Sequence, residues 1–173
     1  QADMPSERVI MNMLKSVLPA LCVAWILAGC AVSDGLPKLQ TWPKWQSGET
    51  RWFKLESLDA GGNVLQTSLL AVQPEQDTLR FVQTDPLGAP VSRQVLSRKG
   101  WANDGFVAPN AEARRLFGAL LPLLAAPGQA VYPQQQSRQE QGETVYFQQN
   151  HELWRSRLSA DGQTFIRFPN QKQ

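Results

Sequence analysis

Apolar and polar residues alternate in short runs through most of the chain, which is the pattern of half-buried β-strands. Such runs lie at residues 50–58, 63–73, 77–84 and 91–98, and a shorter one follows Lys99-Gly100 at Trp101. The sequence Asp59-Ala60-Gly61-Gly62 between the first two runs is typical of a hairpin turn. Because each connection is short, we expect these strands to pair antiparallel.

After Asn110 the apolar residues change to helical spacing. Asn110 is a good helix cap, Pro122 is expected to kink or shorten the last turn, and Pro127-Gly128 ends the helix. We expect the helix to lie across one face of the sheet, with Gly118 on the opposite side of the helix. Its apolar face consists of Ala113, Leu116, Phe117, Leu120, Leu121 and Leu124.

Three further alternating runs follow the helix, at residues 144–150, 153–159 and 163–168. Residues 132–143 between the helix and these runs are polar and rich in glutamine, so we expect a loop there. The pattern therefore predicts seven or eight strands and one helix, without an internal repeat or a second domain.

An uncharged, mostly apolar run at residues 16–27 lies behind Lys15 and is followed by Ala28-Gly29-Cys30. This order is typical of a lipoprotein signal peptide, in which Cys30 receives a diacylglycerol and, after cleavage, a further acyl chain. An ordinary secretory signal is one alternative. A transmembrane helix is another, but residues 16–33 fall short of the roughly 20 apolar residues that a span needs.

These features divide the chain into four segments. We expect the translation start at Met11 or Met13, and Trp42 and Trp45 to dock the end of a tether. Ala31 after the cysteine favours sorting to the outer membrane, facing the periplasm, if the host is Gram-negative. The segments are an upstream extension at 1–10, a signal peptide at 11–29, a lipidated tether at 30–48 and a single β domain at 49–170.

Charge and cysteine content exclude several classes of function. The formal net charge is only +2 and the basic residues are not clustered, so nucleic acid is not expected as a partner. Cys22 lies in the signal peptide and Cys30 is acylated. The mature chain therefore has no disulfide and no thiol metal site, and must be held together by its hydrophobic core.

Catalytic chemistry is poorly represented. His151 is the only histidine, and a single histidine is weak evidence for a catalytic nucleophile with its base. We expect a surface or structural role for it. Asp85 and Asp104 are candidates for an acid–base pair, but nothing in the sequence places them together. Neither a metal constellation nor a phosphate loop is present, so we expect no cofactor and no enzyme activity.

The order of motifs nevertheless resembles a known group. A lipobox and strand meander precede residues 84–90 (TDPLGAP), Gly100-Trp101, a helix with residues 120–123 (LLPL) and three last strands. This order resembles the LolA/LolB type of lipoprotein carrier and, more narrowly, a family of outer-membrane lipoproteins associated with aryl polyene pigment gene clusters. The resemblance covers about Leu39 to Phe168.

The resemblance implies a mainly β (α+β) fold, in which a curved antiparallel sheet or incomplete barrel of about seven to nine strands has a helix over its concave face. It also implies an apolar cavity for acyl chains and a protruding apolar loop, here Pro86, Leu87 and Gly88. An ordinary sandwich core would produce the same apolar pattern. The residues expected to line the cavity are Phe53, Leu55, Phe81, Val95, Phe147, Trp154 and Phe165, and those expected to cover it are Leu116, Phe117 and Leu120.

Three functions follow, in decreasing order of preference. The first is a non-catalytic lipoprotein, held to the membrane by the lipid on Cys30, that binds or relays lipoprotein acyl chains, a free lipid or a pigment ester. The second is an accessory lipoprotein that docks an envelope transporter or assembly through a sheet edge or the loop at residues 85–90. The third is a hydrolase of envelope lipid or glycan, which would require His151 or Asp104 beside a nucleophile.

Overall fold

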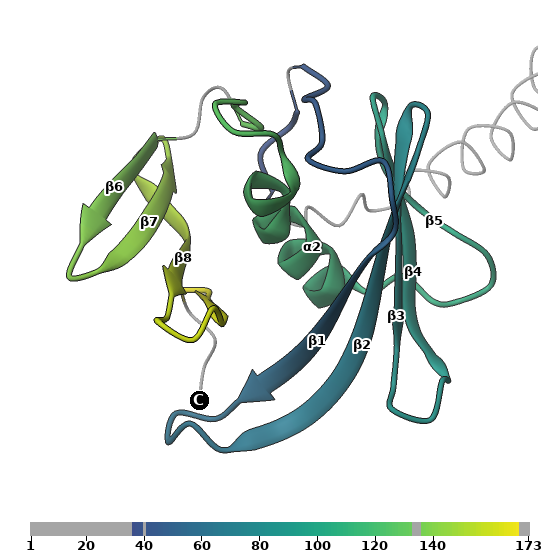
Figure 1. Cartoon of the computed structure of the whole chain (residues 1–173), viewed down its shortest axis with the longest axis horizontal. Coiled ribbons are helices and arrows are strands. Elements are labelled where there is room, and N and C mark those ends of the chain that lie inside the picture. The colour runs from purple at the N-terminus through teal and green to yellow at the C-terminus, as the bar shows by residue number, and fades with distance from the viewer. Residues whose placement is uncertain (1–35, 40, 133–135, 170–173) are drawn as a thin grey trace, which may run out of the picture. The chain divides into compact units, whose positions relative to one another are not determined.

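The computed structural model describes residues 36–39, 41–132 and 136–169, and in this part of the chain it contains nine strands and one helix (Figure 1). The prediction of a mainly β, antiparallel fold is confirmed at this level. The elements are β1 (Arg51–Leu58), β2 (Val64–Glu75), β3 (Thr78–Thr84), β4 (Pro90–Ser97), β5 (Gly100–Asn103), α2 (Ala111–Leu124), β6 (Gln136–Glu140), β7 (Glu143–Gln148), β8 (His151–Leu158) and β9 (Thr164–Arg167).

The strands form two separate antiparallel sheets. The first has the order β1-β2-β3-β4-β5 and the second the order β6-β7-β8-β9. Each strand pairs with its neighbour in the sequence, as the short connections predict. Within the described residues no ladder joins the two sheets, so the strands do not close into a barrel.

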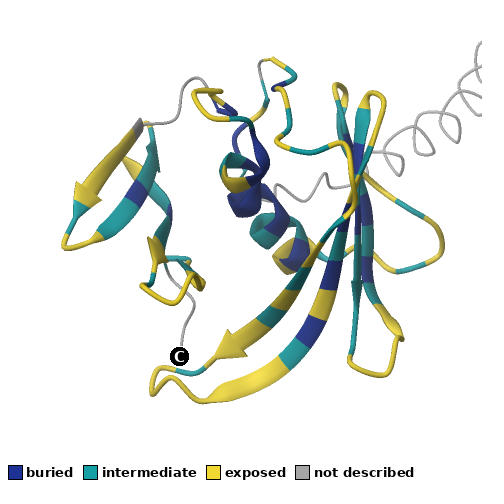
Figure 2. Ribbon diagram, viewed as in Figure 1, coloured by how far each residue is buried: buried dark blue, intermediate teal, exposed yellow. Residues whose placement is uncertain are grey.

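The first sheet buries one face and exposes parts of the other (Figure 2). Leu70 and Phe81 point to the buried face, whereas Leu69 on the opposite face is exposed. The hairpin turn between β1 and β2 forms as predicted. The carboxylate of Asp59 accepts hydrogen bonds from the backbone N–H groups of Gly61 and Asn63, both at 2.8 Å.

Helix α2 begins where the sequence predicts. The side chain of Asn110 caps it by accepting a hydrogen bond from the backbone N–H of Ala113 at 2.9 Å. The expectation that Gly118 lies on a polar side is wrong, because Gly118 is buried. A β-carbon at this position would lie 2.5 Å from Leu36 Cδ2, so only glycine lets residue 36 pack this closely on the helix.

Pro122 lies inside α2, and the helix continues through it to Leu124. Proline has no N–H, so the carbonyl of Gly118, four residues earlier, loses its usual helical donor. The hydroxyl of Tyr132 donates to this carbonyl at 2.9 Å in a buried environment. A side chain that follows the helix thus replaces the missing backbone donor.

Replacing Tyr132 by phenylalanine is expected to lower the free energy of unfolding by about 1–3 kcal/mol, because the buried Gly118 carbonyl loses this donor. In a Pro122→Ala background the loss should be smaller, since an alanine in place of the proline supplies a backbone N–H to the same carbonyl. Urea denaturation of the four proteins measures the coupling between the two positions. An equal loss in both backgrounds would contradict this account of the proline.

The second sheet contains one strand that the sequence pattern missed. Residues 132–143 were expected to be a loop, but β6 (Gln136–Glu140) lies within them and pairs with β7. A bulge at Tyr146/Phe147, opposite Leu153, then directs both Leu153 and Trp154 toward the core.

One hydrophobic core joins the two sheets and the helix. It includes Phe81 from the first sheet, Phe117 and Leu121 from α2, and Trp154 from the second sheet. The compact unit that contains this core extends from Asp34 to Gln173. Because the unit has its own core, we expect it to fold without residues 1–33.

The described residues before β1, 36–39 and 41–48, belong to this compact unit and do not form a free tether. Trp45 forms an isolated β-bridge with Ala125, and Trp42 and Trp45 pack against the core. The backbone N–H of Gln46 donates to the carbonyl of Leu124 at 2.9 Å. The segment thus satisfies a carbonyl at the end of α2, where helices lack internal partners.

Candidate functional site

Most of the residues expected to line or cover an apolar space are brought together at the core. Phe81, Phe117, Leu120 and Trp154 are members of the core cluster. Phe53, Leu55 and Leu116 are partly buried and pack against it, so they lie at its margin. The sequence pattern therefore correctly identifies several residues of the hydrophobic core.

The aromatic rings of this centre contact one another directly. Phe81 of β3 stacks on Phe117 of α2 with 5.0 Å between ring centroids, and Trp101 lies 5.2 Å from Phe81. On the second sheet, Trp154 stacks on Tyr146 at 5.1 Å and meets the edge of Tyr132 at 6.0 Å. Helix α2 thus contacts the aromatic residues of the first sheet directly, through Phe117. It contacts those of the second sheet through Tyr132, whose hydroxyl donates to Gly118.

The structure does not bring Val95, Phe147 and Phe165 to this centre. Val95 is paired with Arg80, on the face of the first sheet opposite Phe81. Phe147 and Phe165 lie on the face of the second sheet opposite Trp154, where Arg138 and Arg157 stack on their rings at 4.3 and 4.7 Å.

The loop at Pro86–Gly88 is an apolar tip whose backbone is hydrogen-bonded to Asp85. It connects β3 to β4, and Leu87 is 95% exposed. One carboxylate oxygen of Asp85 accepts hydrogen bonds from the backbone N–H groups of Leu87 and Ala89, at 2.9 and 2.8 Å. Gly88 has a φ of 91°, a conformation that favours glycine. The tip is therefore held in place without packing of its leucine.

Gln94 is a buried polar residue that the sequence pattern did not single out. Its side chain is 1% exposed and donates to the hydroxyl of Ser92 and to the carbonyl of Asn110, both at 3.0 Å. Its oxygen accepts from Arg114 Nε at 2.8 Å. Gln94 thus ties β4 to the first turn of α2. The only sign of this role in the sequence is that Gln94 is polar although it occupies a position of β4 that the alternating pattern assigns to the buried face.

Four buried side-chain atoms have no hydrogen-bond partner among the described residues. Three are donors, Trp45 Nε1, Arg93 Nε and Trp154 Nε1. The fourth is the amide oxygen Gln83 Oε1, whereas the amide nitrogen of Gln83 donates to Ser68. Buried donors and acceptors are paired in most proteins, so these four atoms are exceptions within the fold.

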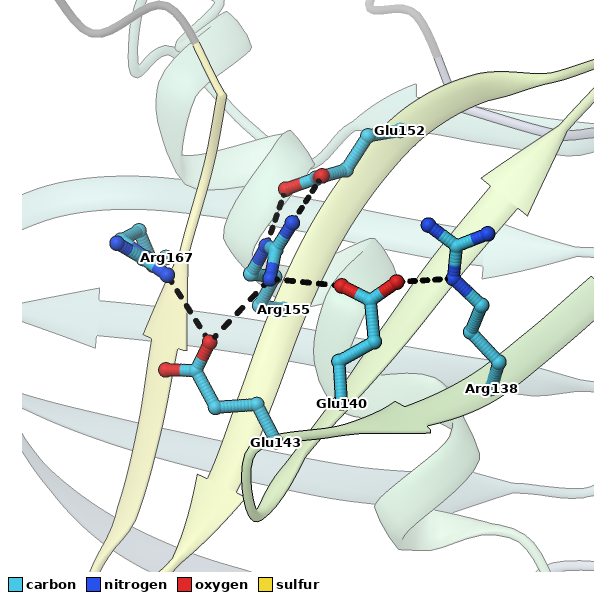
Figure 3. A network of polar contacts seen from close by, with 6 residues as sticks. All are labelled: Arg138, Glu140, Glu143, Glu152, Arg155 and Arg167. Carbon is cyan, nitrogen blue, oxygen red and sulfur yellow. Dashed lines mark hydrogen bonds and ion pairs between the residues drawn. The ribbon is translucent and has the colours of Figure 1, made fainter.

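The outer face of the second sheet carries a network of ion pairs (Figure 3). Arg155 of β8 donates two hydrogen bonds of 2.7 Å to Glu152 and also contacts Glu140 and Glu143. The hydrogen bond from Arg155 lowers the pKa of Glu152, and the reverse effect raises the pKa of Arg155. Arg167 pairs with Glu143, so the network connects all four strands and its charges compensate one another.

The candidates for catalysis lie apart in the fold. His151 is the exposed first residue of β8. Asp104 follows β5, where burial raises its pKa but hydrogen bonds from Arg93 and Arg80 lower it to below its ordinary value. The carboxylate of Asp85 is engaged by the turn described above. Within residues 36–39, 41–132 and 136–169, no group of histidine, cysteine and carboxylate side chains could hold a metal ion.

Cys30, the proposed site of lipidation, and the signal peptide lie outside the described residues. In the described part of the chain no helix has both the length and the apolar character needed to cross a membrane.

Comparisons of the chain with models of protein families, with curated proteins and with solved structures found no match.

Proposed function

We propose that this chain is a lipid-anchored outer-membrane lipoprotein with a LolB-like fold that binds and relays an acylated lipid, without catalysis. In this proposal the acyl chains lie at the margin of the hydrophobic core, where residues of the first sheet and of α2 are only partly buried. The observation on which the proposal mainly rests is the hydrogen-bonded tip between β3 and β4 with its exposed Leu87.

The tip has the properties of a membrane-contacting element. Residues 86–90 (PLGAP) contain no charge, and Leu87 has almost no contact with the rest of the protein. Burial of a leucine side chain in an apolar phase is worth roughly 1.5–3 kcal/mol. Because Asp85 fixes the turn in advance, little of this free energy is lost in ordering the backbone.

The margin of the core supplies the surface for the cargo. Phe53, Leu55 and Leu116 are only partly buried there, so an acyl chain can contact them without disrupting the stacked rings. Each CH₂ group that becomes buried contributes about 0.8 kcal/mol.

The lipid on Cys30 keeps this site at the membrane. A single acyl chain gives only marginal membrane binding, whereas the two or three chains of a processed lipoprotein give stable attachment. Such an anchor places the Leu87 tip in a position to meet the same bilayer repeatedly. The protein would face the periplasm of a Gram-negative cell.

The experiment that tests this proposal is transfer of a fluorescent fatty-acyl probe from the soluble unit, residues 34–173, to phosphatidylethanolamine and phosphatidylglycerol vesicles. Leu87→Glu is expected to slow transfer about tenfold or more, since a charge at the tip opposes entry into the bilayer. Binding of the probe in solution should be unchanged, because Leu87 is remote from the core margin.

The matched control is Leu158→Glu, which places the same charge at another exposed leucine, 71% accessible, at the end of β8. This variant should transfer the probe at the rate of the unaltered unit. Equal slowing by both variants would show that general surface hydrophobicity drives transfer, and an unchanged rate in Leu87→Glu would show that the tip is not the contact.

A second candidate is an envelope-docking lipoprotein that holds no ligand. The observation that favours it is the direct stacking of Phe81 on Phe117, both fully buried, which fills the space between sheet and helix with side chains. Failure of the soluble unit to take up any acyl probe would favour this candidate over the carrier.

A further inference from the structure

The free edge of β1 combines an unpaired backbone with exposed apolar side chains. β1 is the first strand of its sheet and its ladder is with β2 alone among the described residues. On the outer face of β1, Trp52 is 72% and Leu58 39% exposed. A free edge of this kind is a template for pairing with another strand.

We propose that β1 pairs with β1 of a second copy of this chain, antiparallel and about a two-fold axis, with Leu55 opposite Leu55. The two five-stranded sheets would then form one continuous sheet across the dimer. This inference rests on the edge and charge pattern of β1 and does not depend on lipid binding.

The sequence of β1 selects this register. In a two-fold antiparallel pair, directly opposite residues lie on the same face, so registers differ in steps of two residues. With Leu55 on the axis, Lys54 of each copy lies opposite Glu56 of the other. Shifting the register by two residues in one direction puts Lys54 of one copy opposite Lys54 of the other. Shifting it by two residues in the other direction puts Glu56 opposite Glu56. Only the proposed register pairs both charges with opposite ones, and like charges directly opposite are destabilising.

The same register covers the exposed apolar residues. Trp52 of each copy lies opposite Leu58 of the other, so both pairs are removed from water together. Within one chain Lys54 Nζ already lies 2.5 Å from Glu56 Oε1. In the dimer these side chains and their symmetry mates form a cluster of four alternating charges on the outer face. Larger shifts of register would shorten the ladder, whereas this one uses nearly the whole strand from Arg51 to Leu58.

Charge reversal tests the proposal on the soluble unit, residues 34–173. Lys54→Glu places two carboxylates opposite each other on both sides of the axis, and Glu56→Lys places two ammonium groups there. Each variant alone is expected to raise the dissociation constant of the dimer about tenfold or more relative to the unaltered unit. An equimolar mixture should dimerise, because every carboxylate of the first variant then lies opposite an ammonium group of the second.

Sedimentation velocity over a concentration series measures all four samples, and circular dichroism verifies that each variant is folded. Dimers of the unaltered unit and of the mixture, but not of the separate variants, would support the pairing. A monomeric unaltered unit throughout the series would overturn it. A mixture that behaves like its separate components would overturn the register.

A disulfide test locates the axis without altering charge. The unit from residue 34 contains no cysteine, so Leu55→Cys introduces a single thiol. Directly opposite residues of antiparallel strands have Cα atoms about 4.5–5.5 Å apart, which a disulfide can bridge. Under mild oxidation Leu55→Cys should give a cross-linked dimer. The control Phe53→Cys, which faces Ser57 of the other copy, should not, and the reverse result would contradict the proposed axis.

Discussion

Replacement of Phe117 by alanine is expected to lower the free energy of unfolding by about 3–5 kcal/mol. Phe117 is fully buried, stacks on Phe81 and lies 6.5 Å from Trp101. Its removal eliminates the stacking of α2 on Phe81 of the first sheet and leaves a cavity that the remaining rings cannot readily fill. A loss of this size is a large share of the roughly 5–15 kcal/mol by which domains are usually stable.

The chain provides a matched control for this variant. Phe106, in the segment between β5 and α2, is fully exposed, so Phe106→Ala should change stability by less than about 0.5 kcal/mol. Urea denaturation of the soluble unit measures both variants. Similar losses at the two positions would contradict the packing of α2 on the first sheet.

Replacement of Gln94 by leucine is expected to cost about 2–3 kcal/mol, although leucine is more apolar and similar in size. The side chain of Gln94 satisfies the carbonyl of Asn110, the hydroxyl of Ser92 and the guanidinium of Arg114. Leucine would leave these groups without the partner that Gln94 provides, and the guanidinium is charged, which increases the penalty.

The matched control for Gln94 is the same substitution at Gln66, an exposed residue of β2. Gln66→Leu should leave the free energy of unfolding within about 0.5 kcal/mol of its original value. Chemical denaturation monitored by tryptophan fluorescence distinguishes the two variants. An unchanged stability of Gln94→Leu would show that the link between β4 and α2 is dispensable.

The elements that the sequence predicted well are those whose signals are local. The turn at Asp59 and the cap at Asn110 use side-chain hydrogen bonds that reach only a few residues along the chain. Strand β6 gave no such signal, because its five residues (QSRQE) are all polar. It is held by its ladder with β7 and by the stacking of Arg138 on Phe147, which are contacts between strands.

The predicted lining residues show where alternation becomes ambiguous. Val95 and Leu96 are adjacent apolar residues of β4, so the sequence alone does not say which of them faces the core. The register of β4 with β3 places Leu96 opposite Leu79 on the buried face and Val95 opposite Arg80 on the other. Phe165 was misleading for a related reason, since a phenylalanine on an outer face can be covered by an arginine.

The close packing of the segment before β1 could not be predicted because it depends on distant partners. Pro37 and Pro43 suggested an extended tether, yet Ala126 N–H donates to the carbonyl of Lys44 at 2.8 Å, beyond the end of α2. Gly118 is part of the same contact, because the absence of its side chain makes room for Leu36. A glycine in an apolar helix is thus the one local sign of this packing.

The central claim, that the margin of the apolar core binds an acylated lipid, is tested most directly by native mass spectrometry. The unit of residues 34–173 would be exported to the periplasm of a Gram-negative host and purified without detergent. We expect a stoichiometric adduct with the mass of an acylated lipid, or the appearance of one when a fatty-acyl probe is added. A mass of the protein alone, unchanged by added probe, would contradict the claim.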